Sequence, residues 1–586
     1  MNIFAHSKRW LFFALVLVSL TLTSCTSYAS HEWLEAPDWS RAVQIGVSES
    51  AYPVVPAIDE QGNSYFAIAR IESNVPQIVV SSYNESLDLR WQQILDLERL
   101  NRANSPGLIV RDKGVEIFWI LNDDLYSALY SLDGDQIGEV QRISGSRAVS
   151  YYNVSVDREG RRVLWFSGDR SEPGLYYVDP NGNIAAVDFE GYKPQIAIGM
   201  DNTMYAAWIQ TEVTRVANHV FVAAYPNAEY QDDQEENVYT IGLSVTAGLN
   251  GPEIALDQNN LYIFWSEQSR TGISAGNIDS FYVTRSLESL ETSREQDLGF
   301  PYAYNLIYSD YQSFYEAGQR ALPEQQLIYT LPILNDISAN NVQRGETVLA
   351  FQARLPFLRN KYANQAGLIF LEDGAVTGYQ LLSFTPGISE LPSIQSDEDG
   401  YLYFTWMEQS SGDELRAYYA TTRPVSKAVL DTIDSQDTMR LTGNTLFGFI
   451  SGMLLLPFPL LWSLGPIAVF FLLGFLRRDD EPITAPGTLI TIVVSWVAYN
   501  FTKLFTLPGI LTYVPFSAWI PVIPPAWYMT LRIGVPLFIG LLAFFLAWRS
   551  TYRRENPSLM FFLALFMIWD GVLTIGIYGV LFYGAV

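Results

Sequence analysis

The stretch that decides the fold is Pro252–Trp265, with the sequence PEIALDQNNLYIFW. Two short runs, PEIALD and LYIFW, alternate apolar residues with other residues and flank a turn of Gln and Asn. Such a pattern predicts a β-hairpin with one face turned toward a core. A lone hairpin buries too little surface to be stable in water, so this unit needs neighbours of the same kind.

Those neighbours are present in the sequence. Pro194–Trp208 and Pro392–Trp406 repeat the unit closely. Less regular copies occupy Pro56–Ile68, Leu108–Trp119, Asn153–Trp165 and Val342–Phe351. A second hairpin often follows, as in Leu175–Gly182. Four strands per unit at intervals of about 50 residues predict a β-propeller of about seven blades over residues 40–424. Residues 266–341 exceed one blade, and we expect an insertion around Pro301–Gln326.

These repeats resemble the blades of sialidase-like (BNR-type) propellers and related bacterial surface propellers. The Asp-box of that family, Ser-x-Asp-x-Gly-x-Thr-Trp, is not intact, and its nearest echo is Ser131–Asp135. The resemblance implies the fold. The arginine cluster, Tyr/Glu pair and acid Asp of sialidases cannot be assigned in this sequence, so the resemblance does not carry catalysis with it.

Charge and composition narrow the function classes. The net charge is −26, and residues from 441 onward hold seven Lys or Arg and five Asp or Glu, so the first 440 residues carry −28. Such a surface repels nucleic acid. The three histidines, at 6, 31 and 219, are too scattered for a metal cluster or a Ser-His-Asp triad. The repeated tryptophans are expected in the blade core rather than on a ligand platform.

Acidic turns leave one cofactor alternative open. Asn122–Asp124, Asp133–Asp135 and Asp397–Gly400 suit Ca²⁺, which prefers oxygen ligands. Asx-rich hairpin turns explain the same residues equally well. We therefore predict no cofactor and no metal site, with Ca²⁺ as the alternative.

The N-terminus has the pattern of an export signal. Lys8 and Arg9 precede the apolar run Leu11–Leu22, and Leu22-Thr-Ser-Cys25 resembles the lipobox of bacterial lipoproteins. The resemblance implies a signal peptide over 1–24, lipidation of Cys25 and a tether over 25–39. An ordinary signal peptide or an uncleaved anchor is the alternative. Because Cys25 is the only cysteine, the mature chain has no disulfide and no thiolate metal site.

A membrane domain is expected after a linker over 425–445. Leu446–Leu476 is uncharged and longer than the roughly 20 residues that span a bilayer. Further apolar spans are Gly487–Leu507, Leu531–Trp548 and Ser558–Phe582. Basic residues at 477–478, 549 and 553–554 mark two cytoplasmic loops, so four crossings place the propeller and the C-terminus outside. Prolines and aromatics over 504–531 indicate an outer interfacial or re-entrant loop.

Two charges fall inside the predicted spans, Lys503 in the second and Asp570 in the fourth. Both helices run outward, and their depths differ by about 6 Å at 1.5 Å per residue. A charge at that depth is costly alone, so we predict a contact between them, direct or through Asn500 or water. Ionisable groups at such a depth usually mark a functional site. The alternative is a purely structural role, with a snorkelling lysine and a hydrogen-bonded aspartate.

Together these features predict an all-β propeller followed by an all-α, four-helix transmembrane domain over 446–586. The expected location is the cytoplasmic membrane, with several crossings. The expected role is binding or scaffolding of an extracytoplasmic protein or glycan, with membrane lipid as the other partner. A surface glycan hydrolase and a transport or sensing unit are the alternatives.

Overall fold

The structure, a computed structural model, places two compact units. Among the residues that the structure describes, one unit covers 31–432 and the other covers 435–579. Within them the structure describes residues 31–32, 38–48, 52–72, 75–97, 104–169, 171–212, 217–232, 234–242, 247–269, 278–302, 329–332, 338–341, 345–358, 361–383, 387–409, 414–432, 435–452, 462, 464–474, 485–506, 528–552 and 559–579.

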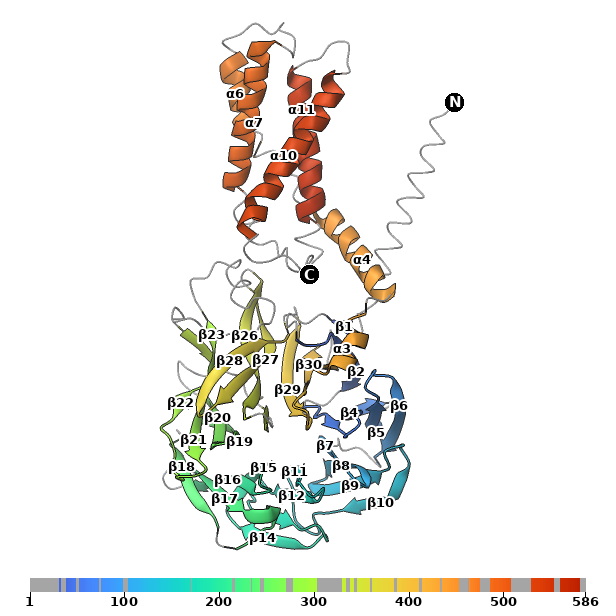
Figure 1. Cartoon of the computed structure of the whole chain (residues 1–586), viewed down its shortest axis with the longest axis vertical. Coiled ribbons are helices and arrows are strands. Elements are labelled where there is room, and N and C mark those ends of the chain that lie inside the picture. Colours follow the sequence, from blue (N-terminus) through green and yellow to red (C-terminus); the bar gives the residue numbers. More distant parts are fainter. Residues whose placement is uncertain are drawn as a thin grey trace. The chain divides into compact units, whose positions relative to one another are not determined.

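The first unit is a seven-bladed β-propeller. Each blade is an antiparallel sheet, and Figure 1 shows the innermost strands around the middle of the ring. Blades 1 to 3 comprise β3 (Ala57–Ile58), β4 (Ser64–Glu72), β5 (Val75–Tyr83) and β6 (Leu89–Asp96); β7 (Asn104–Arg111), β8 (Gly114–Leu121), β9 (Asp124–Tyr130) and β10 (Gln136–Arg142); and β11 (Tyr151–Val156), β12 (Arg162–Ser167), β13 (Leu175–Val178) and β14 (Ile184–Asp188).

Blades 4 to 6 follow in chain order. They comprise β15 (Gly191–Ile198), β16 (Met204–Glu212), β17 (Ala217–Tyr225) and β18 (Glu236–Gly242); β19 (Ala247–Leu256), β20 (Asn260–Ser269), β21 (Ile278–Ser286) and β22 (Gln296–Asp297); and β25 (Ser338–Asn341), β26 (Thr347–Leu358), β27 (Lys361–Glu372) and β28 (Ala375–Leu381). A short helical turn, η1 (Pro226–Ala228), joins two strands of blade 4. An extra pair, β23 (Gly299–Tyr302) and β24 (Tyr329–Pro332), lies between blades 5 and 6, where the insertion was predicted. Residues 303–328 lie outside the described residues.

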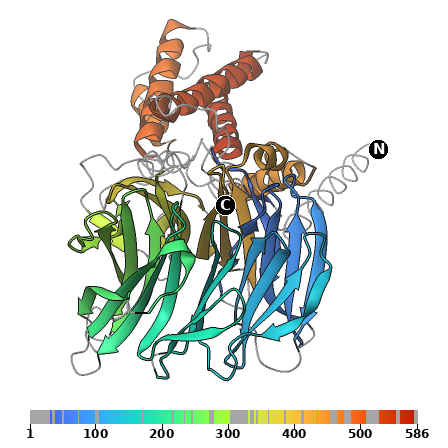
Figure 2. The ribbon, with the colours of Figure 1, turned by 60° about the horizontal axis from the view of Figure 1, so that its bottom comes forward.

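Blade 7 closes the ring with strands from both ends of the propeller sequence. It contains β29 (Ile388–Ser396), β30 (Leu402–Gln409) and β31 (Leu415–Thr421), and β2 (Ala42–Ser48) pairs with β31, followed outward by β1 (His31–Glu32). Figure 2 shows the blades from another side. Closing a ring in this way joins the start of the propeller sequence to its end by a full set of backbone hydrogen bonds.

Helix α3 (Pro424–Leu430) follows β31 and is hydrogen-bonded to the propeller near the place where blade 7 closes the ring. Ser426 Oγ donates to the carbonyl of Glu85 at 2.7 Å, and Lys427 Nζ donates to that of Trp39 at 2.7 Å. These two hydrogen bonds hold α3 against the propeller at the point where the chain leaves it.

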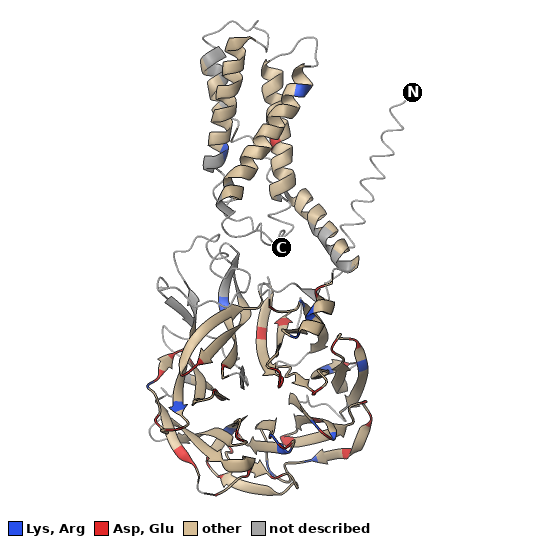
Figure 3. Ribbon diagram, in the orientation of Figure 1, with Lys and Arg blue, Asp and Glu red and all other residues tan. Residues whose placement is uncertain are grey.

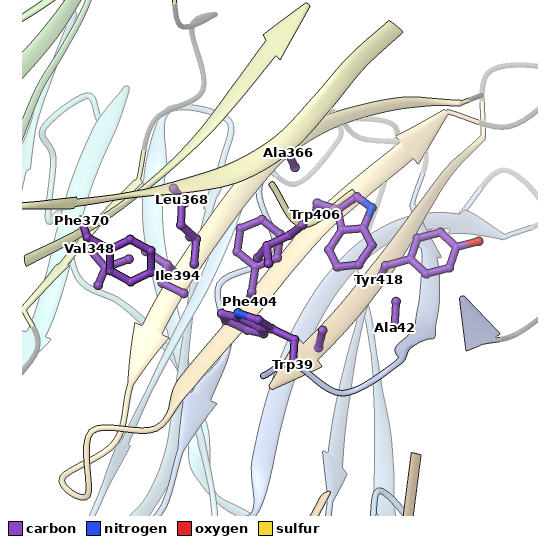
Figure 4. Packing of buried hydrophobic residues seen from close by; sticks show 13 residues of the cluster. Trp39, Ala42, Val348, Ala366, Leu368, Phe370, Ile394, Phe404, Trp406 and Tyr418 are labelled. Atoms are coloured by element: carbon purple, nitrogen blue, oxygen red, sulfur yellow. The ribbon is translucent and has the colours of Figure 1, made fainter. Parts of the chain in front are cut away.

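The core of the ring confirms the tryptophan prediction. Five tryptophans on the second strand of five blades are at most 2% exposed, and each pairs across to an aromatic residue on the third strand. The pairs are Trp119–Tyr126, Trp165–Tyr177, Trp208–Phe221, Trp265–Phe281 and Trp406–Tyr418, with ring centroids 5.5–5.9 Å apart. In blade 6 Phe351 replaces the tryptophan, opposite Gly367. Figure 4 shows one such cluster, in which Trp406, Phe404 and Tyr418 of blade 7 pack with Leu368 and Phe370 of blade 6.

The second unit is helical. It contains α4 (Ser435–Gly452), α6 (Leu464–Gly474), α7 (Pro486–Thr506), α10 (Tyr528–Tyr552), α11 (Leu559–Thr574) and a π-helical turn, η5 (Ile575–Gly579). The stretch predicted as a linker, 425–445, is helical in α3 and the start of α4. Helices α7, α10 and α11 match the predicted second, third and fourth spans closely.

Among the described residues of this unit, two stretches are long and apolar enough to cross a membrane by themselves, Ile533–Tyr552 and Leu559–Tyr578. The expected first span is described as α4 and α6, and residues 453–461 between them lie outside the described residues. The arginines at 477–478 and 553–554 and the loop over 507–527 lie outside them as well.

Candidate functional site

A large cavity lies at the axis of the propeller. Its volume is about 1370 Å³. Its wall comprises residues of the innermost strands β3, β7, β11, β15, β19 and β29, together with turns and loops beside them. Figure 1 labels β7, β11, β15, β19 and β29 around the middle of the ring. The cavity therefore brings together residues of six blades.

A repeated backbone bulge shapes this wall. In four innermost strands the ladder skips two residues, a residue of positive φ followed by a proline. The four pairs are Ser105-Pro106 (φ 48°), Lys193-Pro194 (φ 53°), Gly251-Pro252 (φ 108°) and Leu391-Pro392 (φ 54°). Proline suits a bulge because it has no N–H to contribute to the ladder. A positive φ is costly for a residue other than glycine, and such backbone is concentrated at functional sites.

Each bulge precedes a residue that lines the cavity. These residues are Gly107, Gln195, Glu253 and Ser393, and Asn153 of β11 joins them from blade 3. We call these five residues the axial collar. Pro194, Pro252 and Pro392 were visible in the sequence as the first residues of repeats, whereas the repeat of blade 2 was placed at Leu108, after Pro106. The positive φ before each proline, which sets the collar in place, appears only in the structure.

Three members of the axial collar are linked in series across three blades. Asn153 Nδ2 donates to Gln195 Oε1 at 2.5 Å, and Gln195 Nε2 donates to Glu253 Oε1 at 3.1 Å. Among the described residues, none donates a hydrogen bond to the second carboxylate oxygen of Glu253. The hydrogen-bonded series thus ends on the carboxyl group of Glu253, whose second oxygen can still accept a hydrogen bond.

Burial changes the acid–base behaviour of Glu253, the last residue of this hydrogen-bonded series. Desolvation raises the pKa of Glu253 to about 8, although the nearby positive charge of Lys193 opposes the shift. Burial lowers the pKa of Lys193, whose Nζ donates to the carbonyl of Leu249 at 3.1 Å and lies 5.4 Å from the ring centre of Tyr151. Near neutral pH, Glu253 can therefore hold or release a proton.

The charged residues of the cavity wall are mainly acidic. Three arginines line it, Arg111, Arg158 and Arg423. Nine acidic residues line it: Asp59, Glu60, Asp112, Asp157, Glu159, Glu253, Asp397, Glu398 and Asp399. Figure 3 shows acidic residues in red among the strands and turns of the ring. The electrostatic potential of the cavity is therefore negative.

Each of the three arginines already donates to the protein. Arg111 binds Glu116, and Arg158 donates to the carbonyl of Gly199 at 3.4 Å. Arg423 binds Asp397 at 3.0 Å and also binds Glu85. These guanidinium groups are held by internal partners.

The turn Asp397–Gly400, one of the acidic turns that suit Ca²⁺, has hydrogen bonds of its own. No group of three or more His, Cys, Asp or Glu among the described residues is arranged to hold a metal ion. Asp397 Oδ1 accepts the Tyr401 N–H at 2.8 Å, and its Oδ2 accepts the hydroxyl of Tyr403 at 2.7 Å. The turn hydrogen bonds predicted as the other explanation are present here.

The helical unit contains the second group of interest. Lys503 Nζ on α7 donates to both oxygens of Asp570 on α11, each at 2.9 Å, and to Thr574 Oγ1 at 2.8 Å. Tyr499 donates its hydroxyl to the same carboxylate at 2.7 Å. The predicted contact between Lys503 and Asp570 is confirmed, and it is direct. Asn500, the alternative bridge, donates to the carbonyl of Trp496 at 2.9 Å.

Cys25, the predicted lipidation site, lies outside the described residues. Its modification stays a prediction.

Comparison with known proteins finds distant likenesses to solved structures alone. No family model matches the sequence, and no curated protein matches it. Among solved structures, polysaccharide lyase Uly1 is 9% identical with a TM-score of 0.41, over 64% of this chain and 91% of that chain. The β-propeller domain of the Trilobed protease from Pyrococcus furiosus is 8% identical with a TM-score of 0.34, over 67% and 99%. A Trypanosoma rangeli sialidase in complex with 2,3-difluoro-KDN is 9% identical with a TM-score of 0.33, over 67% and 55%.

Proposed function

We propose that this chain is an extracytoplasmic binding module that is anchored in the cytoplasmic membrane and takes a glycan into the axial cavity of its propeller. The observation that carries the proposal is the series Asn153–Gln195–Glu253 on the cavity wall. Amide and carboxyl groups offer both donors and acceptors to the hydroxyl groups of a sugar. A concave site with a few convergent polar groups is the usual form of a ligand site.

The chemistry of the cavity favours binding over the sialidase-type alternative. A sialidase needs free arginines to hold an acidic sugar, whereas Arg111 and Arg423 are bound to carboxylates of the protein itself. The excess of acidic residues on the wall also repels an anionic substrate.

The distribution of apolar and polar side chains in the helical unit supports the membrane part of the proposal. Its outer faces expose large apolar side chains, such as Phe501 (72%), Phe538 (64%) and Ile568 (59%). Its buried faces hold polar residues, among them Ser495 and Thr491. Helices that face lipid have this arrangement, because hydrocarbon solvates apolar groups and excludes polar ones. Four crossings, with the propeller outside, remain part of the proposal.

A transport or sensing role is the second candidate, and the ion pair in the bundle favours it. Thr574, which accepts from Lys503, is the last residue before the π-helical turn η5. Such turns occur frequently at functional sites. Under this proposal, variants of Lys503 or Asp570 that still fold would lose the transport or signalling activity.

The test of the main proposal is a binding measurement on the full chain in lipid nanodiscs. A panel of oligosaccharides of defined composition is titrated by calorimetry. We expect Gln195→Ala and Asn153→Ala each to weaken binding by about tenfold, which corresponds to the roughly 1.4 kcal/mol of a lost hydrogen bond. The matched control is Gln141→Ala, which changes an exposed residue on the outermost strand β10. Equal affinity in Gln195→Ala and wild type would refute an axial site.

A further inference from the structure

The carboxyl group of Glu253 is the one acidic group of the axial collar. Gln195, a neutral amide, donates to its Oε1. Among the described residues, none forms an ion pair with Glu253 within 4.0 Å. Lys193 is the cation whose charge acts on the carboxyl group of Glu253. Its ammonium group donates to the carbonyl of Leu249 and lies over the ring of Tyr151. Glu253 thus presents an acidic group to the cavity without a bound counter-charge.

A carboxyl group in this position recognises a positive charge. Ionising it without a partner is unfavourable in a desolvated site, and an ammonium group within hydrogen-bond distance removes that penalty. The eight other acidic residues of the wall act in the same direction, since they raise the local concentration of cations. The three arginines of the wall oppose this effect, but the acidic residues outnumber them nine to three.

The neighbours of Glu253 on the collar indicate what else the ligand carries. Asn153 and Gln195 place amide groups beside the carboxyl, in one row across blades 3, 4 and 5. An ammonium group and hydroxyl groups at adjacent positions of one ring would complement this row. A sugar with a free amino group has both.

We propose that the axial cavity selects glycans that carry free amino groups over their neutral and acidic counterparts, and that Glu253 is the residue that recognises the ammonium group. This inference rests on the proposed function, whose ligand it specifies. The selectivity arises from a difference of affinities between ligands that differ in the charged group at one position of the sugar ring.

The experiment compares two ligands that differ in one group. Oligomers of glucosamine and of N-acetylglucosamine, equal in length and linkage, are titrated into the full chain in nanodiscs at pH 7. We expect the amino oligomer to bind at least tenfold more tightly, and we expect this preference to weaken at high salt. In Glu253→Gln the two oligomers should bind equally, at the affinity that the acetylated oligomer has for wild type.

Two further variants make the result specific. Glu253→Asp keeps the charge and shortens its reach, so it should retain part of the preference. Glu139→Gln removes an exposed acidic residue of the outermost strand β10, away from the cavity wall, and should leave the preference within about twofold of wild type.

Several outcomes would overturn the inference. Equal binding of the two oligomers by wild type, or a preference that survives Glu253→Gln, refutes it while the proposed function stands. Tighter binding of a lysine-containing peptide than of the amino oligomer refutes the choice of a glycan. Binding of neither oligomer refutes the proposed function as well.

Discussion

Lys503 Nζ lies 2.9 Å from each carboxylate oxygen of Asp570, and neither side chain is exposed. The pair joins α7 to α11 across the helical unit. All three protons of the ammonium group have acceptors, because Thr574 Oγ1 takes the third. A buried pair with complete hydrogen bonding avoids most of the penalty that either charge would suffer alone.

The first prediction concerns this pair. Lys503→Ala and Asp570→Ala should each reduce the yield and heat resistance of the folded chain, because each leaves one buried charge unpaired, at about 3–5 kcal/mol. The apolar double variant Lys503→Met/Asp570→Leu should recover part of that loss. Thermal inactivation of the detergent-solubilised full chain measures it, with Arg549→Ala, an exposed charge on α10, as the control. Silent single variants would show that the pair does not stabilise the unit.

The second prediction concerns the blade core. Trp265→Ala should destabilise the propeller by about 3–5 kcal/mol, because it removes a fully buried aromatic side chain and leaves a cavity opposite Phe281. Trp265→Phe should have a smaller effect, since Phe351 stands at the corresponding place in blade 6. Denaturation followed by near-ultraviolet circular dichroism measures both. Equal effects of the two substitutions would contradict the packing argument.

The third prediction concerns the bulges before the prolines. Ser105→Gly should stabilise the propeller by about 1 kcal/mol, because it relieves a positive φ of 48°. Gly251→Ala at the equivalent place should destabilise it. The added methyl carbon would lie 2.8 Å from the carbonyl oxygen of Phe264 and 3.1 Å from the Cα of Trp265. Urea denaturation of the two variants beside wild type should give opposite shifts of the midpoint.

The fourth prediction concerns pH. The pKa of Glu253, about 8 in the folded state, is above the value of 4.5 that it has when exposed. The folded state therefore holds this proton more tightly, and its contribution to stability is lost as the pH rises from about 4.5 to 8. Glu253→Gln removes this loss. Its stability relative to wild type should rise by more than about 1 kcal/mol between pH 5 and pH 9, since one pKa unit corresponds to about 1.4 kcal/mol.

Lys193, the ionisable group whose charge opposes this shift, is present in both proteins, so its own titration largely cancels in the comparison. Denaturant unfolding at a series of pH values gives the difference. A difference that does not change with pH would mean that Glu253 is already ionised at pH 5.

The fifth prediction concerns the N-terminus. Because Cys25 follows Leu22-Thr-Ser, we expect cleavage before it and lipidation of its thiol. Intact-mass analysis of wild type and Cys25→Ala should show a lipid-modified, shortened chain in wild type alone. Identical masses, apart from the substitution itself, would refute a lipoprotein.

The sequence by itself determined the repeating parts of this protein. The unit of Pro252–Trp265 recurs with the same alternation of apolar residues, and alternation in a strand dictates which face is buried. The five tryptophans therefore had to occupy equivalent core positions, and they do. Lys503 and Asp570 were also predictable as a pair, because the rise of a helix converts residue numbers into depths, and isolated charges in an apolar bundle need partners.

Only the tertiary structure decided where the proposed binding site lies. Asn153, Gln195 and Glu253 belong to different blades and have no periodic pattern that separates them from other polar residues of the strands. They meet because three innermost strands converge on one axis and because the bulges at Pro194 and Pro252 offset the ladder just before Gln195 and Glu253. The raised pKa of Glu253 has the same origin. Burial and the distance to a neighbouring charge depend on packing between blades, and the order of residues along one strand does not contain that information.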